Sequence, residues 1–374
     1  MPDSPSRVRV FSSDESLPSE LGNVFSPAHK TLFESRELFR NFEQSGIAPG
    51  FRIRLYALTT IDDDTVRALL SAVYSRLYAA HPRAKVLHFS GVEGTPFIPW
   101  PSQSSRDEST AIDRVIEFVH ADRHGYDVLR FSPLEPHTPV IDQVVAALRR
   151  TGHPTRVYEA PRASYARSAG MTSDAFLAAR PRGLRAPLER ARRMLGDAGR
   201  ANFRLVVDDG SIDAAARDYE RTEDIGKGGA SPELPGYLPG LMRVAARAGV
   251  LRLGFLDVDG APAAAQLWIV SAGVGHCLRI VRVTSHAELP LGDLLTMHMA
   301  RHLIDVDGIA ELEFGTVTAE FARNWTNGTR ARVGVIAFNP RTWRGIKGTV
   351  RHVGLPKLMS IPRHLWRTAG RHGT

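Results

Sequence analysis

The sequence predicts an α/β (α+β) protein made of two compact units, and three observations support this prediction. The chain has 374 residues, which is more than one hydrophobic core usually serves. Segments typical of helices and of strands follow one another along both halves, as they do in layered α/β proteins. In the second half, Asp259-Gly260 separates two apolar runs, which is the sequence signal of a tight β-hairpin.

The first unit is expected at 30–170, after a flexible leader at 1–29 whose beginning is rich in Ser, Pro and Asp. Thr60 or Asp62 is suited to cap the first helix, and His81-Pro82 is suited to end it. The expected elements are, in chain order, a strand at 51–58, a helix at 63–80, a strand at 85–89, a helix at 111–124, a strand at 127–131, a helix at 139–150 and a strand at 155–159.

The second unit is expected at 171–345 and begins with an arginine-rich helical stretch at 173–196. Apolar residues in this stretch, such as Leu184 and Leu188, fall near helical spacing, so one face can pack while the arginines stay in water. The later elements are expected, in chain order, as a strand at 203–207, a helix at 212–221, a Gly/Pro-rich segment at 226–240, a helix up to 248, strands at 251–258, 261–270 and 275–283, a helix at 292–304, a strand at 310–314, a helical turn at 320–325 and a strand at 331–338.

Composition narrows the class of protein. Apolar residues make up 43% of the chain and charged residues 24%, as in folded globular proteins. No window approaches the ~18 consecutive apolar residues of a membrane-spanning helix, and residues 1–20 lack the apolar run of a secretion signal. The single cysteine, Cys277, lies in an apolar run, which favours a buried thiol over a nucleophile. We therefore expect a cytoplasmic protein, with peripheral attachment at the inner membrane as an alternative.

Positive charge is concentrated at the C-terminal end. After Glu320 the sequence has no Asp or Glu but eleven Lys and Arg, within a chain of net charge +8. This asymmetry indicates an anionic partner, either a membrane surface or RNA, for a basic tail at 346–374. A solvated tail without a partner is the alternative.

Four local strings in the second half resemble one family of enzymes. The strings are Ile225-Gly226-Lys227-Gly228, Leu289-Pro290-Leu291-Gly292-Asp293-Leu294-Leu295, Glu313-Phe314-Gly315 and Phe321-Ala322-Arg323-Asn324-Trp325. With the order of elements around them, they resemble the GNAT acyltransferases of the cellulose and exopolysaccharide branch, which is similar in layout to the Fem-type transferases. The resemblance implies tandem GNAT-like lobes, each a mixed, mostly antiparallel twisted sheet flanked by helices, with a degenerate N-terminal lobe.

One departure from the family pattern concerns charge. The branch usually carries Tyr-Lys-x-x-Trp where this chain has Phe321-Ala322-x-x-Trp325, so Ala322 takes the place of the lysine and Arg323 follows it. Either Arg323 substitutes for the lysine, or the activity is altered or lost.

Acyl transfer from a thioester needs a site that holds the diphosphate of the acyl donor. Gly292 opens an expected helix, where unpaired N–H groups and the helix dipole favour an anion; an ordinary helix start is the alternative. The resemblance implies that acetyl-CoA or another acyl-CoA binds at Arg282, Pro290, Leu291, Gly292 and Asp293. It also implies that two central strands part and that a main-chain N–H near 278–280 faces the thioester oxygen.

Candidates for catalysis are Glu313, His276, Arg323 and, as a further possible base, His286. Glu313 shares one face of a short strand with Glu311, and a neighbouring charge or poor solvation would suit one of them to act as a general base. The alternatives are that both carboxylates are simply solvated and that the histidine lies at a strand edge with its hydrogen bonds already made.

Two further residues are assigned to the acceptor cleft by the resemblance, namely Lys227 and Trp325. Trp325 is alternatively a core aromatic residue. No metal is expected, because His298 and His302 lack the glutamate of a zinc protease motif and an evident third ligand.

The leading hypothesis is acyl transfer from acyl-CoA to an amine or hydroxyl of a sugar or another small polar acceptor, in envelope or exopolysaccharide biosynthesis. Ala322 favours one alternative, a non-catalytic GNAT-like module that docks on a synthase or a membrane surface. The other alternative is a Fem-like aminoacyl-tRNA-dependent transferase, in which the basic tail would contact tRNA phosphates.

Overall fold

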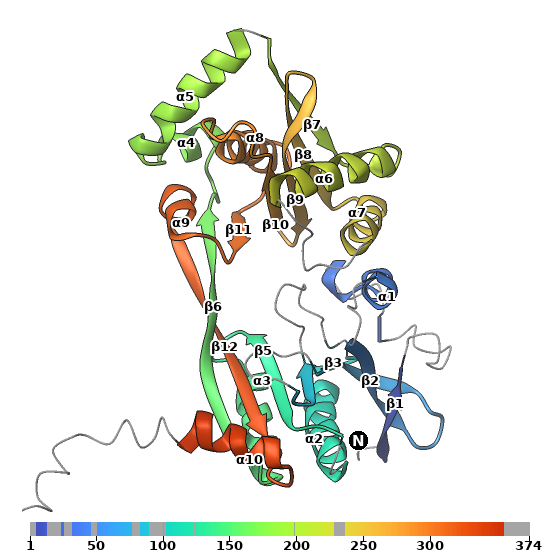
Figure 1. Cartoon of the computed structure of the whole chain (residues 1–374). Helices are drawn as coiled ribbons and strands as arrows, with labels where there is room; N and C mark the ends of the chain where they lie inside the picture. The colour runs from blue at the N-terminus through green and yellow to red at the C-terminus, as the bar shows by residue number, and fades with distance from the viewer. Residues whose placement is uncertain are drawn as a thin grey trace, which may run out of the picture. The chain divides into compact units, whose positions relative to one another are not determined.

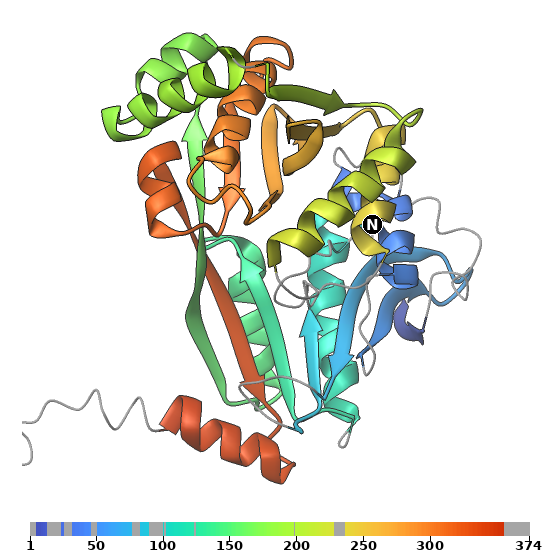
Figure 2. The same ribbon diagram turned by 45° about the horizontal axis from the view of Figure 1, so that its top comes forward.

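The fold consists of two compact units, each built of strands and helices (Figures 1 and 2), and the strands of both belong to one 12-stranded sheet. A computed structural model describes residues 5–12, 24–25, 32–45, 51–76, 83–89, 100, 102–122, 125–197, 199–227 and 236–354. Unit 1 comprises 1–26, 48–160 and 332–374, and unit 2 comprises 27–47 and 161–331. The chain passes from unit 1 to unit 2 within β6 (Thr155–Arg167) and returns within β12 (Gly328–Phe338).

The sheet of unit 1 has the strand order β1-β2-β3-β4-β5-β12, and the neighbours with a described register are antiparallel except for β4 and β5. Helices α2 (Ser105–Ala121) and α3 (Pro139–Arg150) contribute buried residues to the same hydrophobic core as the sheet, in which the rings of Phe89 and Phe131 stack at 4.6 Å. The other elements of unit 1 are β1 (Ser6–Phe11), β2 (Phe51–Thr60), β3 (Val66–Ser75), β4 (Val86–Phe89), β5 (Val128–Leu134), α10 (Trp343–Thr349) and a π-helical turn (Val350–Gly354).

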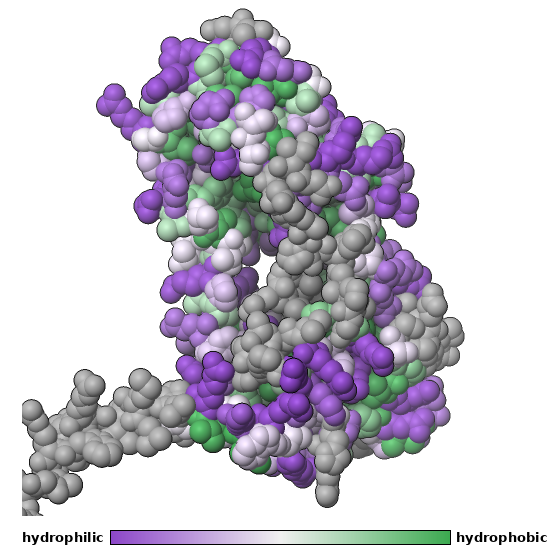
Figure 3. All heavy atoms as spheres, in the orientation of Figure 1, coloured by the Kyte–Doolittle hydropathy of each residue, from purple (hydrophilic) through white to green (hydrophobic). Residues whose placement is uncertain are grey.

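The sheet of unit 2 has the strand order β6-β11-β10-β9-β8-β7, and its neighbours are antiparallel except for β10 and β11. Its strands are β7 (Ala201–Val206), β8 (Leu251–Val258), β9 (Ala261–Ser271), β10 (Val274–Arg282) and β11 (Glu311–Gly315). Its helices are a 3-10 turn (Leu32–Glu34), α1 (Arg36–Ser45), α4 (Ser173–Ala178), α5 (Arg182–Asp197), α6 (Ile212–Lys227), α7 (Tyr237–Arg247), α8 (Leu291–Asp305) and α9 (Ala319–Trp325). In the view of Figure 3, the surface over α5 carries mainly hydrophilic side chains.

The predicted fold class is confirmed: the protein is α/β, and each lobe is a mixed, mostly antiparallel sheet flanked by helices. The strands expected at 251–258, 261–270 and 275–283 are β8, β9 and β10. Asp259 and Gly260 have φ values of +54° and +80°, as the two central residues of a type I′ hairpin turn require.

The prediction of a helix at 63–80 is wrong. Residues Val66–Ser75 form β3, which pairs with β2 on one side and with β4 on the other. Eight of its ten residues are buried, so pairing and burial in the centre of the sheet outweigh the helical preference of its alanines and leucines.

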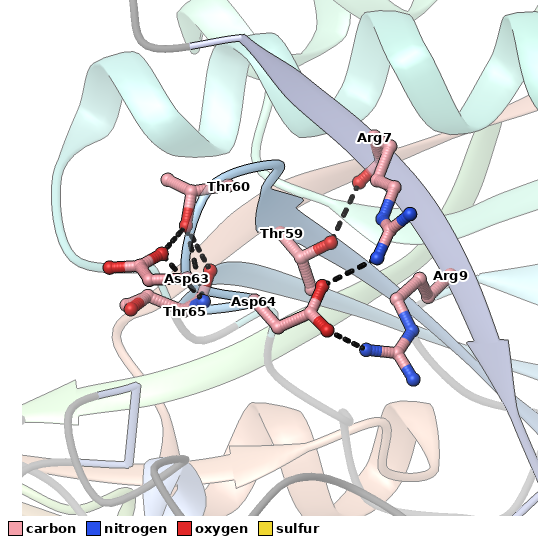
Figure 4. Close-up of polar contacts among 7 residues, drawn as sticks. All are labelled: Arg7, Arg9, Thr59, Thr60, Asp63, Asp64 and Thr65. Carbon is pink, nitrogen blue, oxygen red and sulfur yellow. Dashed lines mark hydrogen bonds and ion pairs between the residues drawn. The ribbon is translucent and has the colours of Figure 1, made fainter.

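The turn between β2 and β3 is held by side chains (Figure 4). Asp64, in the left-handed conformation at φ +57°, forms ion pairs with Arg7 at 2.7 Å and with Arg9 at 3.0 Å. The hydroxyl of Thr60 donates to Asp63 and accepts the N–H of Thr65 at 3.1 Å. Both arginines belong to β1, which occupies residues Ser6–Phe11 of the segment expected as a flexible leader and pairs with β2 along its full length.

The boundaries expected at 29/30, 170/171 and 345/346 do not coincide with those of the compact units. Helix α1 belongs to unit 2, where the side-chain amide of Asn41 donates to the carbonyl of Tyr237 at 3.0 Å and the ring of Phe42 packs edge-on against Tyr237. The end of β12 belongs to unit 1, where Val335 is the register partner of Phe131. Each unit contains segments that are distant from one another in sequence. Dividing the chain at a single position therefore does not separate the two units.

Candidate functional site

The first turn of α8 is the element that the sequence singles out for anion binding. Pro290 occupies the N-cap position, and no side chain caps the helix. The N–H of Leu294 donates to the carbonyl of Pro290 at 2.9 Å, and the N–H of Leu291 donates to that of Leu289 at 2.9 Å. The amides of Gly292 and Asp293 lie between these two, in the turn where helix geometry supplies no intrahelical acceptor.

A cavity of about 300 Å³ opens at this turn, a volume at the lower end of the range for ligand sites, roughly 300–1,000 Å³. Its wall is formed by β10, the start of α8 and the residues at and before α9. The lining residues are Ile280, Arg282, Pro290, Leu291, Gly292, Asp293, Thr318, Glu320, Phe321 and Asn324. The structure therefore brings all five residues expected to bind acyl-CoA to one cavity.

The two parallel strands next to this cavity part beyond a short paired stretch. The register of β10 with β11 covers only Val274–Glu311, Gly275–Leu312 and His276–Glu313. Beyond these pairs β10 continues to Arg282, and its register with β9 shifts between Cys277 and Arg279. Such a β-bulge interrupts the regular ladder and re-aims backbone groups. The segment 278–280, expected to offer a main-chain N–H to a thioester, begins at this bulge.

In unit 1, helix α2 connects two parallel strands, β4 and β5, just as α8 connects β10 and β11 in unit 2. The start of α2, however, is capped by a side chain. The hydroxyl of Ser104 accepts the N–H of Asp107 at 3.2 Å, and Asp107 forms an ion pair with Arg67 at 2.7 Å. All four residues of β4 pair with β5. Only in unit 2 does the described structure combine an uncapped helix start with parted strands.

Gly292 is not required by the packing around it. A Cβ atom built at this position would lie 3.7 Å from Cγ2 of Ile280, which is an ordinary van der Waals contact. The protein fold therefore accepts alanine here, and what glycine adds is space for a ligand close to the backbone.

A buried polar network holds the carbonyl side of the same turn. The side-chain amide of Gln266 donates to the carbonyl of Gly292 at 3.0 Å and to the hydroxyl of Thr296 at 2.7 Å, and this hydroxyl donates to the same carbonyl at 2.8 Å. The indole N–H of Trp268 donates to the amide oxygen of Gln266 at 2.9 Å. Sequence reasoning missed this network, although a glutamine inside an apolar strand was a visible signal.

Trp325 is completely buried, as is expected of an aromatic residue in a protein core. Its indole N–H donates to the carboxylate of Asp293 at 2.6 Å, and its carbonyl accepts a hydrogen bond from Arg180 at 2.8 Å. Burial raises the pKa of Asp293 and the nearby charge of Glu320 adds to this, whereas the hydrogen bond from Trp325 and the charge of Arg282 oppose it.

The structure brings Glu313 and His276 together at the paired end of β10 and β11. They are register partners, and Oε2 of Glu313 lies 3.9 Å from Nδ1 of His276 and 3.1 Å from Nη1 of Arg330. Arg330 also binds Glu311, at 2.6 Å, and lies over the ring of Tyr165. The two carboxylates therefore share one guanidinium group instead of lying free in solvent.

The remaining candidate residues lie elsewhere. Arg323 is exposed on α9 and does not line the cavity at Gly292. Lys227 is the last residue of α6, and its side chain lies outside the described residues. The hydroxyl of Ser285 contacts Nδ1 of His286, which is half-buried. Burial raises the pKa of the Cys277 thiol, which disfavours a thiolate at this position.

Among the described residues, no group of three or more His, Cys, Asp or Glu is placed to hold a metal ion. None of the helices in the described ranges has the length and apolar character needed to cross a bilayer.

Comparisons with known proteins agree with this geometry. Residues 182–323 match the family model of the acetyltransferase (GNAT) domain, so the chain contains a GNAT-type acetyltransferase domain. A search of curated proteins finds no match.

Among solved structures, FemX has a TM-score of 0.53 and 9% identity, over 88% of this chain and 96% of that chain. The C-terminal domain described as that of a lysylphosphatidylglycerol synthetase from Agrobacterium fabrum has a TM-score of 0.51 and 12% identity, over 91% of this chain and 97% of that one. At these identities the likeness shows a shared fold alone.

Proposed function

We propose that this protein transfers an acyl group from acetyl-CoA, or another acyl-CoA, to an amine or hydroxyl of a small polar acceptor. One observation carries the proposal: the uncapped first turn of α8, with a glycine that packing does not require, opens into a cavity beside two parted strands. A diphosphate is the kind of group that such a turn binds.

The residues of the cavity would act on the acyl donor in defined ways. The amides of Gly292 and Asp293 and the guanidinium of Arg282 attract the diphosphate, while the carboxylates of Asp293 and Glu320 oppose it. The acyl chain would enter between β10 and β11, with a main-chain N–H near the bulge after Cys277 stabilising the oxyanion.

Proton transfer is assigned to the pair Glu313 and His276. A general base takes a proton from the acceptor, the acceptor attacks the thioester carbonyl, and the thiolate of CoA leaves as the tetrahedral intermediate collapses. Arg330 keeps Glu313 in place, and Arg323 is proposed to supply the positive charge of the family lysine replaced by Ala322. Lys227 and Trp325 are proposed to border the acceptor cleft.

The acceptor is proposed to be a sugar in envelope or exopolysaccharide biosynthesis, on the strength of the local sequence strings. Residues 346–374 are proposed to contact an anionic surface or RNA, of which 355–374 lie outside the described residues. The substitution at Ala322 favours a second candidate function, a GNAT-like module that binds acyl-CoA without transferring the acyl group.

Calorimetry with the purified full chain tests the proposal. Titration with acetyl-CoA and with longer acyl-CoAs is expected to show saturable binding of at least one of them, and release of free CoA thiol is expected in the presence of amino sugars. Binding without release supports the non-catalytic module. Absence of binding at millimolar acyl-CoA refutes both.

A further inference from the structure

A second cavity, of about 540 Å³, lies in unit 2 alongside α8. Its wall is formed by α4, α5 and the residues between them, by Met297 and Arg301 of α8 and by Trp325. No lining residue is shared with the cavity at Gly292. This cavity therefore needs an explanation that the proposed acyl donor does not supply.

Positive charge dominates the lining of this second cavity. Five arginines face two carboxylates, Asp174 and Glu189. The arginines are Arg180, Arg185, Arg192, Arg193 and Arg301. Asp174 contacts Arg301 at 3.3 Å. Clustered guanidinium groups repel one another, and a bound anion relieves this repulsion.

Two of these arginines, Arg185 and Arg192, have no side-chain hydrogen bond or ion pair with any residue in the described parts of the chain. Both extend from α5, which packs into the core through Leu184 and Leu188. Their guanidinium groups are thus available to a ligand in the cavity.

Arg180 is the strongest sign that the cavity is built for an anion. Arg180 lines the cavity although it is only 8% exposed. Nε donates to the carbonyl of Phe176 at 3.2 Å, Nη1 donates to that of Trp325 at 2.8 Å, and the guanidinium lies over the Phe176 ring at 4.4 Å. Within the described residues no carboxylate pairs with it and Nη2 has no partner.

A buried cation without a counter-ion is costly, and it is tolerated where a partner supplies the missing charge. Burial also lowers the pKa of Arg180, which is the direction expected for an uncompensated charge.

The floor of the cavity is apolar, so the ligand that fits it combines an anionic group with an apolar part. Leu177, Leu184, Leu188, Met297 and Trp325 supply this floor. Guanidinium groups bind phosphate through paired N–H donors. We propose that the cavity between α4, α5 and α8 binds a phosphate ester that carries an apolar group, either as a lipid headgroup or as a free small molecule.

Hexyl phosphate is a suitable probe, titrated by calorimetry into the full-length protein. Arg185→Gln with Arg192→Gln removes two cavity arginines, whereas Arg182→Gln with Arg190→Gln removes the same charge from exposed positions of α5 outside the lining. The first pair is expected to weaken binding about tenfold or more, and the control pair is expected to leave it nearly unchanged. Circular dichroism verifies that both variants fold.

Three outcomes overturn the proposal: no saturable binding of hexyl phosphate by the native chain, equal weakening in the two double variants, or a parallel loss of acetyl-CoA binding in R185Q/R192Q. The last outcome would make the cavity part of the acyl-CoA site. Unchanged acetyl-CoA binding with lost hexyl phosphate binding supports a separate site, whether or not the proposed transferase activity is found.

Sedimentation with vesicles distinguishes the two sources of the phosphate ester. Vesicles of phosphatidylglycerol and phosphatidylcholine are compared with vesicles of phosphatidylcholine alone. A loss of binding in R185Q/R192Q that the R182Q/R190Q control does not share supports a lipid headgroup. Equal vesicle binding by both variants, together with lost hexyl phosphate binding, supports a free phosphate ester.

Discussion

The indole N–H of Trp325 donates to the carboxylate of Asp293 at 2.6 Å, and this contact joins the end of α9 to the first turn of α8. Asp293 lines the cavity proposed for acyl-CoA. Trp325 also lines the arginine-rich cavity on the side of α8. One hydrogen bond therefore connects the walls of the two cavities.

The charge of Asp293 makes the stability of the protein depend on pH. Because burial raises its pKa, the folded protein holds this proton at pH values where the unfolded chain, with an ordinary carboxyl pKa of about 3.9, has released it. The stability that the residue contributes therefore falls as pH rises from the unfolded pKa through the folded pKa.

Asp293→Asn keeps an oxygen that accepts the Trp325 hydrogen bond and removes the charge. The melting temperature of D293N relative to the native chain is expected to increase as pH rises above about 4 and then to level off above the raised pKa. Thermal unfolding between about pH 4 and pH 8 measures this. A difference that does not vary with pH would show that the carboxyl ionises normally.

Gly292→Ala separates folding from ligand binding. Alanine stabilises a helix by about 1 kcal/mol relative to glycine, and the new Cβ meets only Ile280, at an ordinary distance. The variant is therefore expected to be at least as stable as the native chain but to bind acetyl-CoA about tenfold more weakly, because the methyl group holds the diphosphate away from the amides.

Gly183→Ala is the matched control, since Gly183 lies in α5 with no atom within 4 Å of an added Cβ. It is expected to leave acetyl-CoA binding unchanged. Native affinity in G292A would mean that the turn does not bind the diphosphate.

Gln266→Leu tests the network beneath the turn. The change removes the acceptor of the Trp268 indole and a donor to the Gly292 carbonyl, so a loss of about 1–3 kcal/mol in unfolding free energy is expected. Displacement of the turn should also raise KM for acyl-CoA more than it lowers kcat. Thr296→Ser keeps the hydroxyl that binds the same carbonyl and should change KM little; equal effects of the two variants on KM would contradict a positioning role.

Glu313→Gln and Glu311→Gln distinguish catalysis from structure, because both carboxylates bind Arg330. Of these two carboxylates, that of Glu313 lies 3.9 Å from Nδ1 of His276. E313Q is expected to lower kcat by about a hundredfold or more, as loss of a general base does, while E311Q affects mainly stability. Similar kcat values in the two variants would assign both residues to the ion pair alone.

Local signals account for the parts of the fold that the sequence predicts well. Asp259-Gly260 specifies its turn through backbone preferences of two adjacent residues, and the start of α8 is marked by Pro290 and Gly292 themselves. By contrast, β3 is a strand because it pairs with β2 and with β4. The residues of β3 do not by themselves indicate a strand.

The candidate site shows the same limit. The cavity residues at 290–293 are contiguous, and the sequence identifies them. The partners that hold them, Gln266 and Trp325, lie 26 and 32 residues away from the groups they bind. Such contacts depend on how β9, α8 and α9 pack, which periodicity does not specify.

The most direct test is a crystal structure of the protein bound to CoA. The account predicts diphosphate oxygens within hydrogen-bond distance of the main-chain N–H groups of Gly292 and Asp293, with the pantetheine arm running between β10 and β11. A diphosphate bound elsewhere on the chain, with the turn at Gly292 left unoccupied, would contradict it.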